Sequence, residues 1–326
     1  MSDLSKLSRN RFLVIGRAGM DFYPEPAGTR IEDATQFRSE LGGSSANIAV
    51  AITRLGGKAS LLTRVSDDAI GRFCLNQLDR YGIDRQHVSV VGGEFRNSLA
   101  VSESRIQEHQ TVIYRNGAAD FQMSREDVDS VDYSDYAALI TTGTVLAAEP
   151  SRQACLHALG LARKAGCLLI FDIDYRPYSW ASAADASDVY SKAADLCDII
   201  IGNDVEFGFM AGHYDEGLAK ARELANNGAG IVVYKKGEFG STTFADGREL
   251  ETGIFPTEAL KPTGAGDSFM GGFVASLAAG FDTQEAVLRG SACASIVVAR
   301  VGCAPAMPDT DELEAYLASH SGPVFN

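Results

Sequence analysis

The chain has 326 residues, 45% of them hydrophobic, and a formal net charge of −14. This much apolar sequence can bury a large core. The acidic excess argues against nucleic acid or an anionic membrane as a partner, because both require a basic face. An anionic substrate would therefore have to be held by a local basic pocket.

The cysteines and the ends of the chain point to a reducing compartment. The six cysteines are scattered, with no Cys-x-x-Cys pair and no metal-ligand spacing, and the five histidines are dispersed. Residues 1–11 are polar and lack the apolar segment of a secretory signal, and no apolar run is long enough to span a bilayer. We therefore predict a soluble cytoplasmic protein with reduced core thiols.

The N-terminal part begins with a strand and a glycine-rich corner. Residues 11–16 read as a buried strand, and Gly16 and Gly19 form a glycine pair at its end without a dinucleotide-binding fingerprint. Gly42 and Gly43 then precede a helix predicted over 48–55. The alternative for these glycines is a simple loop-to-helix turn capped by a serine.

Two polar segments predict a small separate sheet. Residues 95–115 alternate polar and apolar around a polar break, which predicts an antiparallel hairpin with one exposed face. Residues 35–41 are also strand-like and polar. We expect the two regions, about 22–41 and 95–116, to form a β-sheet outside the main layer.

The remainder alternates regularly between strands and helices. Apolar runs such as 138–142 and 167–172 are separated by helical segments such as 152–164. This alternation predicts right-handed β-α-β units and a largely parallel sheet. A short antiparallel strand is expected at 241–244, and helices over 283–300 and 310–318 should pack against the sheet. The predicted fold class is α/β.

A turn rich in glycine precedes a late helix predicted over 268–279. Gly264 and Gly266 flank an alanine, so successive N–H groups can face one point beside the positive end of the helix. Such a turn suits a phosphate group. Asp267 lies beside it, and a carboxylate there suggests handling of a proton or a metal. The alternative is a tight turn in which Asp267 only caps the helix.

The string Lys261-Pro262-Thr263-Gly264-Ala265-Gly266-Asp267 resembles the C-terminal signature of the ribokinase (phosphofructokinase-B) family of carbohydrate kinases. The resemblance implies one ribokinase-like α/β domain over 1–326, with a largely parallel sheet flanked by helices and the small sheet as a lid. It also implies ATP and Mg²⁺ as cofactors. Two other classes are a catalytically silent sugar or nucleotide sensor and, disfavoured by the missing fingerprint, a dehydrogenase.

The resemblance assigns roles to residues at both ends of the chain. It makes Gly264, Ala265 and Gly266 the anion hole and Asp267 the acceptor of the sugar hydroxyl proton. We expect the helix terminus to lower the pKa of Asp267. The sugar hydroxyls would be held by four residues near the N-terminus: Asp21, Gly42, Gly43 and Asn47.

Polar residues after the later strands complete the implied site, because ligands bind beyond the C-terminal ends of sheet strands. Asp174 would bind substrate and Arg176 would bridge substrate and phosphate, unless they form an internal pair on a surface turn. Asn203 and Glu206 match an Asn-x-x-Glu motif that would order magnesium waters, although they also fit a helix cap. The nucleotide would contact four further residues: Lys235, Gly237, Gly240 and Cys293. For Cys293, simple helix packing is as good an interpretation.

Three segments, 16–21 with 28–30, 174–180 and 235–241, resemble the 5-dehydro-2-deoxygluconokinase subgroup, which phosphorylates the terminal hydroxyl of an open-chain keto acid in inositol catabolism. The carboxylate of such a substrate needs a cation, and Arg115 and Arg176 are the first choices, with Arg30 also a candidate. The rivals are 2-keto-3-deoxygluconate kinase and fructokinase.

Two further expectations follow from the resemblance. Lys261 stands where many members have an aspartate that belongs to a monovalent-cation site. We expect its ammonium group to replace the ion, so that potassium dependence is weak. The β lid is often a dimer surface in the family, which suggests a homodimer.

Overall fold

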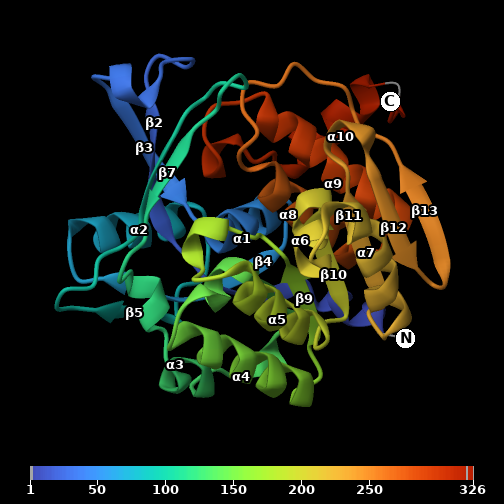
Figure 1. Cartoon of the computed structure of the whole chain (residues 1–326), viewed down its shortest axis with the longest axis horizontal. Coiled ribbons are helices and arrows are strands. Elements are labelled where there is room, and N and C mark those ends of the chain that lie inside the picture. The colour runs from blue at the N-terminus through green and yellow to red at the C-terminus, as the bar shows by residue number, and fades with distance from the viewer. Residues whose placement is uncertain (1–2, 321, 326) are drawn as a thin grey trace.

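The computed structural model describes residues 3–320 and 322–325 (Figure 1). Its main sheet has the strand order β13-β12-β11-β10-β9-β8-β1-β4-β5. Neighbouring strands are parallel from β5 to β11, whereas β12 and β13 pair antiparallel. The strands are β1 (Arg11–Ile15), β4 (Lys58–Ser66), β5 (Val88–Val91), β8 (Ala138–Thr142), β9 (Leu168–Asp172), β10 (Ile199–Asn203), β11 (Ile231–Lys235), β12 (Ser241–Ala245) and β13 (Arg248–Thr252). The predicted parallel sheet is confirmed, and β13, a polar segment, was not predicted.

Helices cover both faces of this sheet and enclose two separate cores. One core holds α1 (Ser44–Arg54), α2 (Ala69–Arg80), α8 (Ala265–Ala278) and α9 (Thr283–Val298). The other holds α3 (Arg125–Asp129), α4 (Ser151–Lys164), α5 (Ala183–Ala194), α6 (Asp204–Ala211) and α7 (Gly217–Asn226). The last helix, α10 (Thr310–Ser319), packs on α9.

The strand β1 shows why the inner strands are apolar without interruption. Phe12 and Val14 enter the first core, whereas Leu13 and Ile15 enter the second. Successive side chains of a strand point to opposite faces, so a strand with a helical layer on each side needs apolar residues at every position. Charged or amide side chains of β9, β10 and β11 appear only where these strands end, among the described residues.

A separate four-stranded sheet projects beyond the main layers, at the upper left of Figure 1. Its order is β3-β2-β6-β7, with β2 (Gly19–Pro24), β3 (Phe37–Gly42), β6 (Leu99–Ser102) and β7 (Thr111–Tyr114). The predicted hairpin is confirmed as the antiparallel pair β6–β7. Its partner β2 was not predicted, because a glycine, an aspartate and a proline interrupt any strand pattern there. The small sheet therefore starts at Gly19, earlier than expected.

Two helices begin earlier than the apolar spacing predicted, and both bring their first turns to the site. Helix α1 begins at Ser44 and α8 at Ala265. The first residues of each are small and polar, so hydrophobic periodicity cannot mark them. Within residues 3–320 and 322–325, no helix is long and apolar enough to cross a membrane.

Candidate active site

The glycine-rich turn at the start of α8 is closely packed against Cys303. Gly264 has φ +84°, and a β-carbon there would lie 2.9 Å from the Cys303 sulfur, so glycine is required on both counts. The Lys235 ammonium lies above the turn, 3.5 Å from where a β-carbon of Gly266 would be. The hydroxyl of Thr263 is buried and has no hydrogen-bond partner in the described chain. The turn thus combines N–H groups, a hydroxyl and a cation.

Asp267 and Asn47 meet across 220 residues of sequence. Asn47 Nδ2 donates a 2.9 Å hydrogen bond to Asp267 Oδ2. Helices α1 and α8 can approach this closely because a β-carbon on Gly271 would lie only 2.3 Å from that of Ala51. The other amide atom, Asn47 Oδ1, is buried and lacks a partner among the described residues. Asn47 can therefore orient the Asp267 carboxylate and still accept a bond from a substrate hydroxyl.

The expectation that the helix terminus lowers the Asp267 pKa is wrong. Burial, and next the negative charge of Asp174, raise the pKa of Asp267 to about 7. The hydrogen bond from Asn47 and the charge of Arg176 act in the opposite direction and only partly offset this. Desolvation of a buried carboxylate outweighs the modest dipole effect. A carboxyl group with such a pKa changes its protonation state near neutral pH.

The two glycines where β3 ends make room for other protein groups. A β-carbon on Gly42 would overlap the Asp21 carboxylate at 1.9 Å, and one on Gly43 would lie 2.4 Å from the Arg17 carbonyl oxygen. Asp21 is buried and forms a 3.2 Å ion pair with Arg17. Burial raises the pKa of Asp21, and the Arg17 charge counteracts it. The corner Gly42–Gly43 thus positions Asp21.

The loop after β9 carries an ion pair beside α1. Asp174 has φ +39°, a region that aspartate tolerates better than most residues. Its carboxylate accepts a 2.6 Å bond from the Ser44 hydroxyl and pairs with Arg176 at 2.6 Å. The internal Asp–Arg pair is therefore present, but the Arg176 side chain is 42% exposed and keeps surface for a ligand.

Two buried carboxylates face Lys235 from the ends of β9 and β10. Burial raises the pKa of Asp172 and of Glu206, and in each case the Lys235 charge is the largest opposing influence. Lys235 itself ends β11 and has no ion pair within the described chain. An unpaired ammonium among buried carboxylates and beside the glycine turn is suited to phosphate oxygens.

Asn203 and Glu206 form a capping box at the start of α6. Asn203 Oδ1 accepts the Glu206 N–H at 2.9 Å, and Glu206 Oε2 accepts the Asn203 N–H at 2.8 Å. The capping box uses only Oε2 of Glu206, so the second carboxylate oxygen, Oε1, can accept a bond from a ligand or a water. Nearby, Gly237 (φ +57°) and Gly240 (φ +82°) flank a short 3-10 turn after β11. A β-carbon on Gly240 would overlap the Thr252 carbonyl oxygen, which explains that glycine.

Three candidates are already engaged by other protein groups. Arg115 is buried, with two nitrogens on Asp120 and the third donating to the Thr144 carbonyl at 2.9 Å. Arg30 is half exposed in the connection between β2 and β3 and pairs with Glu108 at 2.8 Å. Cys293 is fully buried between α9 and α8, where burial raises its pKa to about 12, so its contacts are those of helix packing.

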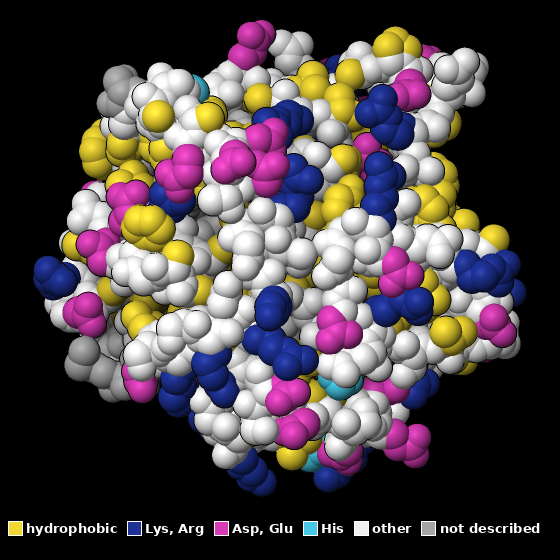
Figure 2. All heavy atoms as spheres, turned by 180° about the vertical axis from the view of Figure 1, so that it is seen from behind, with side chains coloured by type: hydrophobic (Ala, Val, Ile, Leu, Met, Phe, Trp, Pro, Cys, Tyr) yellow, Lys and Arg dark blue, Asp and Glu magenta, His cyan; other side chains and the backbone are white. Residues whose placement is uncertain are grey.

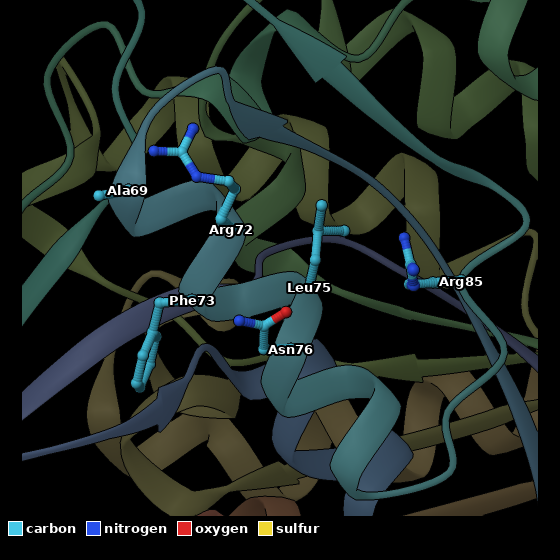
Figure 3. A pocket seen from close by; sticks show the side chains of 6 residues that line it. All are labelled: Ala69, Arg72, Phe73, Leu75, Asn76 and Arg85. Carbon is cyan, nitrogen blue, oxygen red and sulfur yellow. The ribbon is translucent and has the colours of Figure 1, made fainter.

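The open hollow in Figure 3, of about 410 Å³, lies elsewhere. It is lined by α2 side chains such as Phe73 and Asn76, with Arg85 beside them, and it contains none of the residues described above. The back of the molecule mixes acidic and basic side chains over its surface (Figure 2). Among the described residues visible on that face, the basic side chains do not form a continuous strip.

Comparisons with known proteins agree with this site. The profile described as pfkB family carbohydrate kinase matches residues 9–310. The chain belongs to the pfkB family of carbohydrate kinases. It is 39% identical over 307 residues to 5-dehydro-2-deoxygluconokinase of Photobacterium profundum, covering 92% of each chain. It is 36% identical over 315 residues to the enzyme of the same name from Geobacillus kaustophilus, covering 95% of this chain and 94% of the relative.

The structure of another protein has the same fold as this chain. The putative ribokinase II of E. coli in complex with ATP and Mg²⁺ superposes with a TM-score of 0.84, at 21% identity, over 95% of this chain and 99% of that one. The ribokinase-like α/β prediction is therefore confirmed, with a large, mostly parallel sheet and a small separate one.

Sequence reasoning missed three polar residues of this candidate site. Arg17 pairs with Asp21, Ser44 donates a hydrogen bond to Asp174, and the buried Thr263 hydroxyl has no partner within the described chain. Arg17 carried one usable signal, because it is a charged residue directly after a buried strand, where sheet ligands bind. Ser44 and Thr263 carried none beyond their position next to glycines.

Proposed function

We propose that this kinase transfers the γ-phosphoryl group of ATP to the terminal hydroxyl of 5-dehydro-2-deoxy-D-gluconate, forming the 6-phosphate in myo-inositol catabolism. The relatives of this name, at 36–39% identity over nearly the whole chain, support the substrate. The observation that carries the chemistry is Asp267, a partly buried carboxylate whose pKa is raised to about 7, in the first turn of α8 beside the glycine-rich turn.

In the proposed reaction Asp267 accepts the proton of the attacking hydroxyl. Asn47 holds the carboxylate in place and uses its free oxygen to orient the sugar. The N–H groups of Gly264, Ala265 and Gly266 then stabilise charge that develops on the migrating phosphoryl group. Lys235 adds a positive charge above the same turn.

The nucleotide would lie over the ends of β10 and β11, against Gly237 and Gly240. Within the described chain no three acidic, histidine or cysteine side chains are close enough together to hold a metal by themselves. The oxygen donors Asn203 and Glu206 fit Mg²⁺, which keeps several waters and binds through few protein ligands. When bound, the metal ion would neutralise charge on the β- and γ-phosphates.

We also propose that the small sheet is a lid, part of whose surface joins two copies of the chain. Exposed apolar side chains on its outer strands support this: Phe37, Val112 and Tyr114. Light scattering of the wild type and of Tyr114→Glu would test it. A wild type that stays monomeric at high concentration would refute the dimer.

The experiment that tests the function is a substrate panel with ATP, in which ADP release is measured. It contains the proposed acid, 2-keto-3-deoxygluconate, fructose and neutral keto sugars. We expect the highest kcat/KM for 5-dehydro-2-deoxy-D-gluconate. No ADP release with any sugar would instead support a binding protein, and higher activity on fructose would refute the proposed substrate.

A further inference from the structure

Arg17 lies at the substrate side of the site through its backbone. It follows β1, and its carbonyl oxygen accepts the Ala46 N–H at 3.2 Å. A β-carbon on Gly43 would lie 2.4 Å from that oxygen and 3.1 Å from the Arg17 γ-carbon. The residue is therefore part of the corner that also positions Asp21.

The Arg17 guanidinium is buried and held in one orientation. Its Nε donates to the Ser98 hydroxyl at 2.5 Å and its Nη2 to Asp21 Oδ1 at 3.2 Å, so residues near two strands of the small sheet hold it. A β-carbon on Gly19 would lie 2.6 Å from Nη2, so only glycine leaves room for the group. Among the described residues, Nη1 has no hydrogen-bond partner, and a planar guanidinium with a free edge can bind a carboxylate.

Arg17 and Arg176 are linked through neighbouring residues at the start of α1. Arg17 packs on Gly43, and the next residue, Ser44, donates a 2.6 Å bond to Asp174, the ion-pair partner of Arg176. In agreement, the charges of Arg176, Arg17 and Arg115 all act on the pKa of Tyr178, which is on the short helical turn Pro177–Ser179. Arg115 already has protein partners at each nitrogen. Arg17 and Arg176 are the cations left with capacity for a ligand.

We propose that Arg17 and Arg176 form the subsite for the substrate carboxylate, and that Arg17 is the residue that distinguishes a sugar acid from a neutral sugar. This rests on the proposed function. Arg176 is tied to Asp174 at 2.6 Å and is 42% exposed, whereas Arg17 is 8% exposed and its pair with Asp21 is longer. A charged hydrogen bond at the more buried position contributes more.

The test compares Arg17→Gln and Arg17→Lys with the wild type on two substrates. One is the keto acid, and the other is its neutral analogue with CH₂OH in place of the carboxyl group. Loss of a charged hydrogen bond lowers kcat/KM about 10- to 100-fold. In Arg17→Gln we expect this loss of kcat/KM for the acid, caused by a higher KM, and a change of a few-fold at most for the neutral analogue. Arg17→Lys should recover part of the activity on the acid. Arg222→Gln, at the exposed Arg222–Glu249 pair on α7, is the matched control and should leave both substrates unchanged.

The result that overturns the assignment is an equal loss on both substrates, because an arginine that only orients Asp21 would affect both alike. If Arg17→Gln does not fold, Ser98→Ala replaces it, because this change removes one hydrogen bond from the guanidinium group and keeps its charge. It must still lower kcat/KM for the acid more than for the neutral analogue. If the wild type prefers the acid and the Arg17 variant keeps this preference, the role of Arg17 is refuted and the proposed substrate is not. A wild type active only on neutral sugars refutes the proposed substrate together with this subsite.

Discussion

The Lys261 ammonium donates a 2.5 Å hydrogen bond to the carbonyl oxygen of Thr263, the residue before the anion-binding turn. A second bond, of 3.3 Å, reaches the Val297 carbonyl oxygen, and Lys261 is fully buried. A cation among carbonyl oxygens occupies the position in which the family resemblance places a monovalent ion. Burial lowers the Lys261 pKa, and the charges of Cys303, Glu40 and Asp267 oppose this.

We therefore predict that potassium does not activate the enzyme. Initial rates at equal ionic strength in potassium and tetramethylammonium chloride should agree within about twofold, because the lysine already supplies the charge that an ion would bring. Lys261→Ala should lose activity in both salts, since two carbonyl oxygens are left without a donor. Strong activation of the wild type by potassium would contradict the prediction.

Replacement of Asp267 by asparagine should nearly abolish turnover. General-base catalysis typically contributes about 10²- to 10⁴-fold in rate, and asparagine is similar in size but cannot accept a proton. We expect kcat to fall by that factor while ATP binding, measured by calorimetry, changes little. Retention of most activity would remove Asp267 from this role.

The pH dependence of kcat should follow the ionisation of Asp267. Its pKa is raised to about 7, so the active, ionised form is lost as the pH falls through 7. A raised carboxyl pKa also means that the folded protein binds more protons than the unfolded chain between the two pKa values, so this group lowers stability as the pH rises. At pH 8, Asp267→Asn should therefore melt no lower than the wild type. A flat kcat profile between pH 5.5 and 8 would contradict this assignment.

The sequence predicts a site residue when that residue works together with its immediate neighbours in the chain, and it does not when the contact arises from folding. The turn 264–267 was predicted because glycine, alanine and aspartate act there as consecutive residues. The pair Asn47–Asp267 and the pair Arg17–Asp21 arise from packing between elements, so no local pattern contains them. Similarly, β2 is a strand through its pairing with β3 and β6, against its own composition.

The same distinction explains the wrong pKa prediction. From the sequence, Asp267 has only a helix terminus as its known environment, and that favours the charged form. The fold adds desolvation and the charge of Asp174, which comes from the loop after β9. Both influences depend on three-dimensional proximity, so they could not be derived from spacing.

Asn47→Ala should move the pH profile as well as weaken sugar binding. The amide hydrogen bond stabilises the ionised form of Asp267, so its loss should raise the carboxyl pKa further. We expect the midpoint of kcat against pH to shift upward and the sugar KM to rise, with the ATP KM close to that of the wild type. A higher sugar KM with an unchanged midpoint would show that Asn47 contacts only the sugar.

Gly42→Ala tests whether Asp21 binds the sugar. The added methyl group would overlap the Asp21 carboxylate, and because a side chain can move more easily than backbone, the carboxylate should be displaced while the fold survives. We expect the sugar KM to rise about 10- to 100-fold, which corresponds to the loss of one charged hydrogen bond, with little change in the ATP KM. The matched control is Gly160→Ala within α4, where a β-carbon would meet no atom within 4 Å. That change should raise stability by up to about 1 kcal/mol and leave KM unchanged. An unaltered sugar KM in Gly42→Ala would mean that Asp21 serves only to pair with Arg17.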